Sequence, residues 1–227
     1  MCGRYSLICI DDLGLRFRVF DPMLGIRSRF NVAPTDMMPV IIRAERVEAV
    51  TMEWGLVTHG TRDERGSGPL INARAETLAE RPVFRDLLPT NRCLVPAGGY
   101  YEWKREGTRK TPFYIRVKDT TVFAFAGLWR TGTDEGGRPR SCFTILTTEA
   151  NDLVSPVHGR MPVILNRDDE DRWISGAAPS REEMAALLAP FPSDRMECYA
   201  VSPRVNSPLA PNEEGLIHPL TVLDVSG

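Results

Sequence analysis

The sequence VFAFAGLW, residues 122–129, is a short run of apolar residues with several aromatic side chains, which is typical of a β-strand. Residues 131–139 follow as a polar stretch with two adjacent glycines and predict a hairpin connection. Residues 142–147 are again apolar and supply the partner strand. This pair of segments indicates a fold built on antiparallel β-structure.

Similar apolar segments, bounded by glycine, proline and charged residues, recur on both sides of this hairpin. They predict strands at residues 38–43, 47–54, 113–117, 162–165 and 198–201. The clearest helical pattern covers 180–189, where Ser180 and Glu183 have capping-box spacing, and Asn166 is expected to cap a helix that runs through Trp173. Residues 58–69 predict a loop. The expected fold class is α+β: one domain over residues 1–227, with a curved, mostly antiparallel sheet or barrel and short helices at its margins.

The composition excludes several classes of protein. The 227 residues contain no apolar run near the roughly 18 to 20 residues that span a bilayer, and the N-terminus has no signal-peptide pattern, so we expect a soluble, cytoplasmic protein. Five widely spaced cysteines without a CxxC pair predict neither a disulfide framework nor a zinc site, and no cofactor is expected. The net charge of -2 is unlike that of a strongly basic nucleic-acid binder, so any DNA groove must be local.

Cys2 is chemically distinctive because it directly follows the initiator Met1. A small second residue permits removal of the initiator methionine, which would leave an α-amine and a thiol on the same residue. An aldehyde condenses with such an amine to an imine, and the thiol can then close a five-membered thiazolidine ring. The α-amine has an ordinary pKa of about 7.7 to 8.0, so part of it is neutral at physiological pH. The alternative is that Cys2 is simply a small buried residue.

Four motifs occur together with this cysteine. They are Met1-Cys2-Gly3-Arg4-Tyr5, Leu70-Ile71-Asn72-Ala73-Arg74-Ala75-Glu76-Thr77, Gly99-Tyr100-Tyr101-Glu102-Trp103-Lys104 and Val157-His158-Gly159-Arg160-Met161-Pro162. In this order the motifs resemble those of the SRAP (SOS-response-associated peptidase) family of abasic-site processing proteins, and the resemblance covers essentially the whole chain. It implies a protein that binds single-stranded DNA at an abasic site and forms a stable crosslink through Cys2. It also implies possible lyase activity and a peptidase activity that would at least expose Cys2.

The resemblance assigns catalytic roles to four residues. Cys2 is the nucleophile, Glu102 is a proton shuttle whose apolar neighbours would raise its pKa, and His158 donates a proton to the sugar as its ring opens. Asn72 orients the Cys2 amine or the sugar. Each has an ordinary structural alternative: a strand-end glutamate for Glu102, a structural histidine for His158 and a helix N-cap for Asn72.

The resemblance also implies a DNA-contacting set. Arg4, Arg74 and Arg160 are expected to bind phosphates that flank the lesion, although each could instead be a solvated surface arginine. The further expected DNA contacts are Asn31, Pro34, Arg81 and Trp103, with stacking or wedging by Pro34 and Trp103 and a core position as the alternative for Trp103. His59 and His218 match no catalytic motif.

One departure from the family pattern follows Trp54-Gly55-Leu56-Val57. The family commonly carries Pro-Ser-Trp soon afterwards, whereas this chain continues with Thr58-His59-Gly60, so one base-stacking side chain has no counterpart here.

Three functions therefore remain open from the sequence. The first is covalent capture of abasic sites by a monomer that acts on single-stranded DNA at the nucleoid. The second is a thiol peptidase or amidase that uses Cys2 with His158 as its base. The third is a non-catalytic single-stranded DNA binding module in which the arginines bind the backbone.

Overall fold

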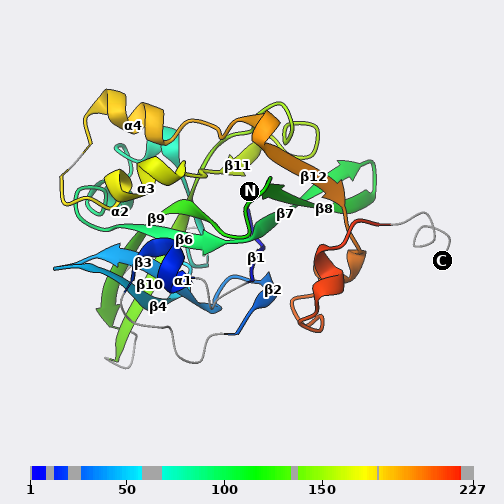
Figure 1. The fold of residues 1–227 in the computed structure, drawn as a ribbon, viewed down its shortest axis with the longest axis horizontal. Coiled ribbons are helices and arrows are strands. Elements are labelled where there is room, and N and C mark those ends of the chain that lie inside the picture. The colour runs from blue at the N-terminus through cyan, green and yellow to red at the C-terminus, as the bar shows by residue number, and fades with distance from the viewer. Residues whose placement is uncertain are drawn as a thin grey trace.

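A computed structural model gives the fold and describes residues 2–8, 13–19, 27–57, 68–133, 138–177 and 179–220 (Figure 1). The strands are β1 Tyr5–Leu7, β2 Arg29–Val32, β3 Met37–Arg43, β4 Val47–Trp54, β5 Asn72–Arg74, β6 Arg92–Ala97, β7 Gly99–Glu106, β8 Arg109–Val117, β9 Phe123–Thr133, β10 Pro139–Glu149, β11 Arg160–Pro162 and β12 Met196–Ala200. The helices are α1 Leu13–Phe17, α2 Pro82–Arg85, α3 Arg167–Trp173 and α4 Arg181–Leu187, with 3₁₀ helices η2 Ala75–Thr77, η3 Ser193–Arg195, η4 Pro203–Asn206 and η5 Glu214–Ile217.

The strands form two sheets. One has the order β12-β8-β7-β1-β2, and the other has the order β11-β10-β4-β3-β6-β9. Because β9 also pairs with β10, the second sheet closes on itself as a barrel. All pairings are antiparallel except those of β10 with β4 and with β5. These observations confirm the predicted α+β class with a curved, mostly antiparallel sheet and short peripheral helices.

The predicted hairpin is confirmed in its pairing. Strands β9 and β10 run antiparallel from Thr133 opposite Pro139 to Gly127 opposite Ile145. Most of the paired residues between Phe123 and Leu128 are buried, as the apolar run indicated. The connecting residues 134–137 lie outside the described part of the chain, as do residues 58–67 of the other predicted loop.

The two predicted helix starts had different outcomes. The capping box of α4 is confirmed, since Ser180 accepts from the Glu183 N–H and the Glu183 carboxylate accepts from the Ser180 N–H. Helix α3 does begin after Asn166, but the Asn166 side chain makes no capping bond. Its amide instead bonds to the side chains of Asp169 and Arg195. The predicted start of the helix is therefore confirmed, and the predicted capping hydrogen bond is wrong.

Several predicted strand boundaries were wrong. Strand β8 begins at Arg109, four residues before its predicted start, β9 continues to Thr133, and β10 covers Pro139–Glu149 rather than residues 142–147. Strand β11 covers Arg160–Pro162, because these residues pair with the end of β10, rather than residues 162–165. Residues 163–165 are buried and bond irregularly to β9 and β10, with only an isolated bridge at Ile164. Strand β12 begins at Met196, two residues earlier than expected, where it meets Val117 of β8.

Strand β1 lies where the two sheets meet and carries the start of the chain into the middle of the molecule (Figure 1). It pairs with β7 on one side and β2 on the other, and it also contacts β6 of the barrel. Residues next to β1 therefore sit among the core side chains of both sheets.

Gly99 allows β7 to pack closely at this junction. A Cβ atom at Gly99 would lie 2.3 Å from the hydroxyl of Tyr114, which is itself 2.7 Å from Ser6 Oγ in a buried hydrogen bond. We expect Gly99→Ala to lower the free energy of unfolding by about 1 to 3 kcal/mol through overpacking, measured by chemical denaturation. Gly176→Ala, where nothing lies within 4 Å, is the matched control, and equal stability of the two variants would contradict the prediction.

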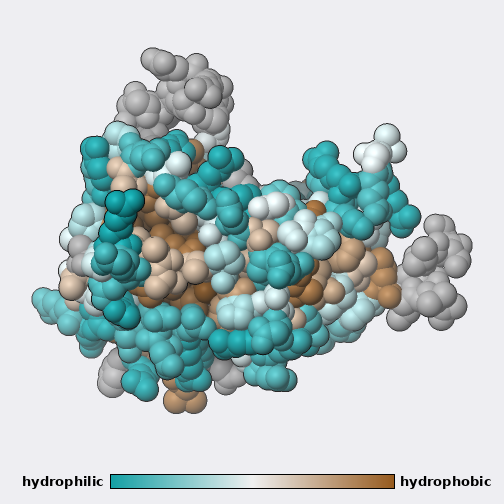
Figure 2. Space-filling model, turned by 90° about the horizontal axis from the view of Figure 1, so that it is seen from above, coloured by the Kyte–Doolittle hydropathy of each residue, from teal (hydrophilic) through white to brown (hydrophobic). Residues whose placement is uncertain are grey.

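On the face in Figure 2, apolar residues form a band between hydrophilic residues on either side. Within the described residues, none of the helices is long and apolar enough to cross a bilayer.

Candidate active site

Cys2 lies immediately before β1 and is fully buried. Its carbonyl oxygen accepts a 2.7 Å hydrogen bond from Asn72 Nδ2, and its Sγ lies 3.6 Å from the Arg4 carbonyl oxygen. Both contacts involve the backbone around Cys2. These two contacts therefore hold Cys2 in one orientation.

Asn72 begins β5, which pairs in parallel with β10. The alternative that Asn72 caps a helix is wrong, because Asn72–Arg74 is a strand and the residue before η2 is Arg74. The Asn72 amide instead reaches Cys2 through Nδ2, while its buried Oδ1 has no hydrogen-bond partner among the described residues. A buried acceptor of this kind suits a donor that arrives with a ligand.

Glu102 lies inside β7, paired with Phe113 of β8, and is only 3% exposed. It is not the strand-end glutamate of the alternative interpretation, because β7 continues to Glu106. Burial raises the pKa of the Glu102 carboxyl, while the nearby His158 ring acts in the opposite direction. Such a carboxyl exchanges protons closer to neutral pH than an exposed glutamate does.

His158 lies just before β11, with its side chain 32% exposed. Its Nδ1 is 3.9 Å from Glu102 Oε1 and accepts a 3.0 Å hydrogen bond from the Arg160 N–H. Only Gly159 separates His158 from β11, which begins at Arg160. Nδ1 also lies 3.0 Å from the Arg160 carbonyl oxygen, so both backbone polar groups of Arg160 hold the imidazole ring.

The four predicted catalytic residues are thus connected through space. Cys2 precedes β1, which pairs with the strand β7 that carries Glu102, whereas Asn72 and His158 are held beside β10 by β5 and β11. Thr147 of β10 pairs with both of these short strands. A hydrogen bond joins Asn72 to Cys2, and a close approach joins Glu102 to His158.

The Cys2 thiol is not poised as a thiolate. Burial raises its pKa, and the negative charge of Glu102 raises it further. The thiol of Cys2 is therefore protonated at neutral pH, unlike the activated cysteines of thiol hydrolases, whose pKa is lowered.

Two of the three expected phosphate-binding arginines already have partners. Arg4 Nη1 donates to Asn31 Oδ1 at 2.8 Å and to the Val205 carbonyl at 3.0 Å, which ties β1 to the C-terminal segment. Arg160 makes a forked pair with Glu76. Arg74 is exposed and has no hydrogen-bond or ion-pair partner among the described residues, which leaves it accessible to a ligand.

The remaining expected DNA contacts differ in exposure. Asn31 is 5% exposed and bonds to Arg4 and to the Ser207 carbonyl, which is a structural role. Pro34 and Trp103 are partly exposed, and Arg81 is exposed with its guanidinium 4.9 Å from the Phe84 ring centroid.

Two residues near the site were missed by sequence reasoning. Asn206 Oδ1 accepts from the Trp103 indole at 2.6 Å, and Glu76 binds Arg160. Glu76 lies inside the motif Leu70 to Thr77. Asn206 ends the segment Val201-Ser202-Pro203-Arg204-Val205-Asn206, which also resembles the family, so both positions carried a signal in the sequence, but their partners could not be read from it.

His218 takes no part in this cluster. His218 is exposed and lies 3.6 Å from the Glu214 carboxylate, and His59 lies outside the described residues.

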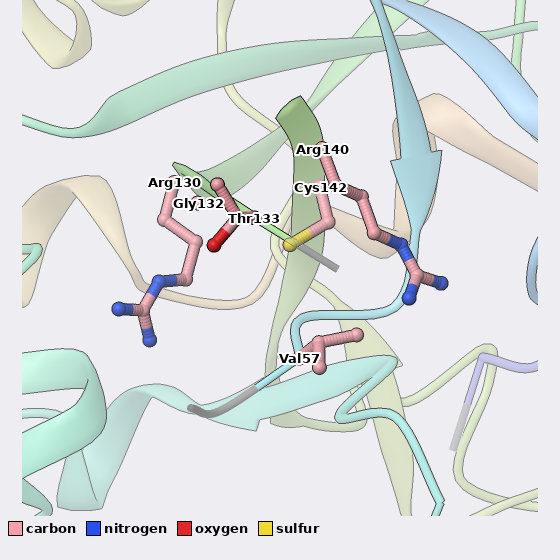
Figure 3. A pocket seen from close by; sticks show the side chains of 6 residues that line it. All are labelled: Val57, Arg130, Gly132, Thr133, Arg140 and Cys142. Atoms are coloured by element: carbon pink, nitrogen blue, oxygen red, sulfur yellow. The ribbon is translucent and has the colours of Figure 1, made fainter. Parts of the chain in front are cut away.

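A small hollow elsewhere on the surface holds another cysteine (Figure 3). The Cys142 sulfur points toward Thr133, while the guanidinium groups of Arg130 and Arg140 point outward. The lining includes no histidine or carboxylate that could act as a base, so this hollow does not offer the nucleophile-base pair that a thiol hydrolase requires.

Comparison with known proteins gives a consistent relationship. The family described as SOS response associated peptidase (SRAP) matches residues 1–208. The abasic site processing protein YoaM of Bacillus subtilis is 39% identical over 92% of this chain and 94% of its own length. The abasic site processing protein YedK of Escherichia coli is 31% identical over 91% of this chain and 95% of its own length.

Solved structures show the same fold. A crystal structure of a protein from Bacteroides thetaiotaomicron has a TM-score of 0.85 and 28% identity, covering 97% of this chain and all of the other. One from Bordetella bronchiseptica has a TM-score of 0.75 and 26% identity, covering 88% of this chain. With its fold and motifs shared along almost its whole length, the chain belongs to the SOS response associated peptidase (SRAP) family.

Proposed function

We propose that this protein processes abasic sites by capturing the ring-opened deoxyribose in single-stranded DNA as a thiazolidine crosslink on Cys2, after Met1 has been removed. The observation that carries the proposal is the contact set around Cys2, in which Asn72 holds its carbonyl and the buried Glu102 lies beside His158. The names of the relatives, abasic site processing proteins, support the same substrate.

The first half of the reaction joins amine and aldehyde. His158 gives a proton to the ring oxygen and the anomeric hydroxyl gives one up, so the closed deoxyribose opens to its aldehyde without net change in protons. The neutral Cys2 amine then attacks the aldehyde carbon, and Glu102 carries a proton from the amine nitrogen to the former carbonyl oxygen, which gives a carbinolamine. Transfer of the second nitrogen proton to the same oxygen lets it leave as water and forms the imine.

The second half closes the ring. The Cys2 sulfur adds to the imine carbon, its proton passes to Glu102, and the nitrogen takes up one proton. The balance is one amine, one thiol and one aldehyde converted to one thiazolidine and one water, without oxidation or reduction. Glu102 suits both steps because burial raises its pKa toward the range in which a carboxyl both gives and takes protons. If β-elimination from the imine outruns ring closure, the result is lyase cleavage of the strand.

The raised pKa of the Cys2 thiol favours a reaction in which the amine attacks first over the reaction of a thiol peptidase. A peptidase requires a thiolate that attacks first, but burial and Glu102 both raise the pKa of Cys2. In thiazolidine formation the amine attacks first, and the sulfur needs to lose its proton only during ring closure.

The DNA strand is expected to meet the site beside Arg74, which is exposed and lies two residues after Asn72 on β5. Phosphate contacts by arginine give affinity without reading sequence, which suits a lesion that can occur anywhere.

The test is intact-mass spectrometry of the protein after incubation with a single-stranded oligonucleotide that carries one abasic site. We expect a heat-stable adduct with the mass of protein plus DNA minus one water, and none with an undamaged strand or with Cys2→Ala. Absence of the adduct, with removal of Met1 confirmed in the same spectrum, would reject covalent capture.

A further inference from the structure

Arg160 is held by a carboxylate at the place where a phosphate is expected. Its Nη1 and Nη2 donate to the two oxygens of Glu76 at 2.8 and 2.9 Å. Nη2 also donates to the Thr147 carbonyl at 2.7 Å, and the buried Nε has no hydrogen-bond partner among the described residues. The two terminal nitrogens of Arg160, Nη1 and Nη2, are therefore both hydrogen-bonded to Glu76.

The exposure of the pair shows how it can be broken. The Arg160 side chain is 18% exposed and that of Glu76 is 43% exposed, so the carboxylate lies on the solvent side of the guanidinium. Arginine binds carboxylate and phosphate through the same two parallel N–H bonds. A phosphate that approaches from solvent would take the position that Glu76 occupies.

The positive charge of the arginines around Glu76 also indicates that this position suits an anionic group. Hydrogen bonding to Arg160 lowers the pKa of Glu76, and the positive charges of Arg160 and Arg74 add to this effect. Glu76 is thus ionised at neutral pH and offsets part of the positive charge of two arginines expected to bind the same DNA backbone.

We propose that Glu76 is a phosphate surrogate, which occupies the forked site of Arg160 in the DNA-free protein and is displaced by a backbone phosphate when the strand binds. This inference rests on the proposed function. Glu76 thereby weakens the binding of DNA that must displace it from Arg160, and holds the guanidinium in its binding orientation until the strand arrives.

A purely structural pair predicts the opposite result. The backbone of Arg160 holds His158, because the Arg160 N–H donates to His158 Nδ1. If Glu76 only kept Arg160 and His158 in place, its loss would weaken DNA binding or leave it unchanged. If Glu76 competes with phosphate, its loss strengthens DNA binding.

The experiment measures noncovalent binding of a single-stranded oligonucleotide with a tetrahydrofuran abasic analogue, which has no aldehyde to trap. Fluorescence anisotropy at several salt concentrations would compare wild type, Glu76→Gln and the control Glu80→Gln. The control removes the same charge four residues later, at an exposed side chain without a hydrogen-bond or ion-pair partner among the described residues. We expect Glu76→Gln to bind about three- to fivefold tighter than wild type, and Glu80→Gln to bind as wild type does.

Arg160→Ala provides the second arm. In that background Glu76→Gln should give a clearly smaller gain in affinity, because the competed site is gone and only the repulsion between the Glu76 charge and the DNA backbone is relieved. Equal or weaker binding by Glu76→Gln, or a gain that is undiminished without Arg160, would overturn the proposal. Thermal unfolding of each variant shows whether it is folded, and misfolding of Glu76→Gln would itself identify the pair as structural.

The two proposals fail in different ways. Wild type that binds the analogue but forms no adduct with a true abasic site refutes covalent capture alone. Wild type that binds neither strand refutes both.

Discussion

One uncleavable residue placed before Cys2 is expected to abolish the covalent adduct with abasic DNA, with a loss of at least about 10²-fold in rate. The extension turns the Cys2 amine into an amide, which does not condense with an aldehyde, and without the imine the sulfur has no carbon to close upon. The thiol itself is unchanged. Adduct yield against time, read on a denaturing gel and by intact mass, measures the effect.

This variant separates the proposed chemistry from a thiol peptidase. A peptidase needs only the thiol and a base, so it would tolerate the extension. Binding of the tetrahydrofuran analogue is the control and should be at least partly retained, since the basic side chains remain. Cys2→Ser is the complementary variant: it keeps the amine, and borohydride should trap its imine with abasic DNA. An extended protein that crosslinks at the wild-type rate would rule out the mechanism.

Glu102→Gln is expected to slow adduct formation by about 10² to 10⁴-fold, the usual contribution of a positioned acid-base group. The amide preserves shape but cannot carry a proton from the amine or from the thiol. Single-turnover rates over a pH series are the measurement. In wild type the rate should fall as pH decreases through the pKa of Glu102, which burial places above the ordinary carboxyl range. The glutamine variant should lack this step.

Unfolding through this carboxyl cannot account for the fall in rate as pH decreases. Because the folded state raises the pKa of Glu102, the protonated carboxyl is the form that folding favours. Its contribution to stability is present below the pKa of the unfolded chain and is lost as pH rises through the folded pKa. Glutamine avoids this loss, so the variant should be at least as stable as wild type at neutral pH. Glu106→Gln, at the exposed end of the same strand, is the matched control. A Glu102→Gln protein as fast as this control would remove Glu102 from the mechanism.

Local signals in the sequence predicted much of the architecture. The β9–β10 hairpin followed from two apolar runs and a glycine-containing turn, and the start of α4 followed from the spacing of Ser180 and Glu183. These features depend on residues close together in the chain, so their energetics can be read from the sequence. The resemblance of four short motifs also identified the family, which the comparisons confirm.

The chemistry of an N-terminal cysteine singled out Cys2, and the resemblance of the motifs to the family added Asn72, Glu102 and His158 as candidates. Only the tertiary structure showed that they meet, because their approach depends on how β5 and β11 register against β10 and how β1 pairs with β7. Because β11 begins at Arg160 rather than at Pro162, Arg160 pairs with the end of β10 and its N–H holds His158.

The three arginines show most clearly what the sequence determines and what depends on the tertiary structure. Arg4, Arg74 and Arg160 look equivalent in the sequence, each a cation in a motif. In the folded protein Arg4 binds the C-terminal segment, Arg160 binds Glu76 and Arg74 is exposed. The sequence determined which charges are present and what chemistry Cys2 can perform. The partners of those charges come from distant parts of the chain, and therefore only the tertiary structure decided them.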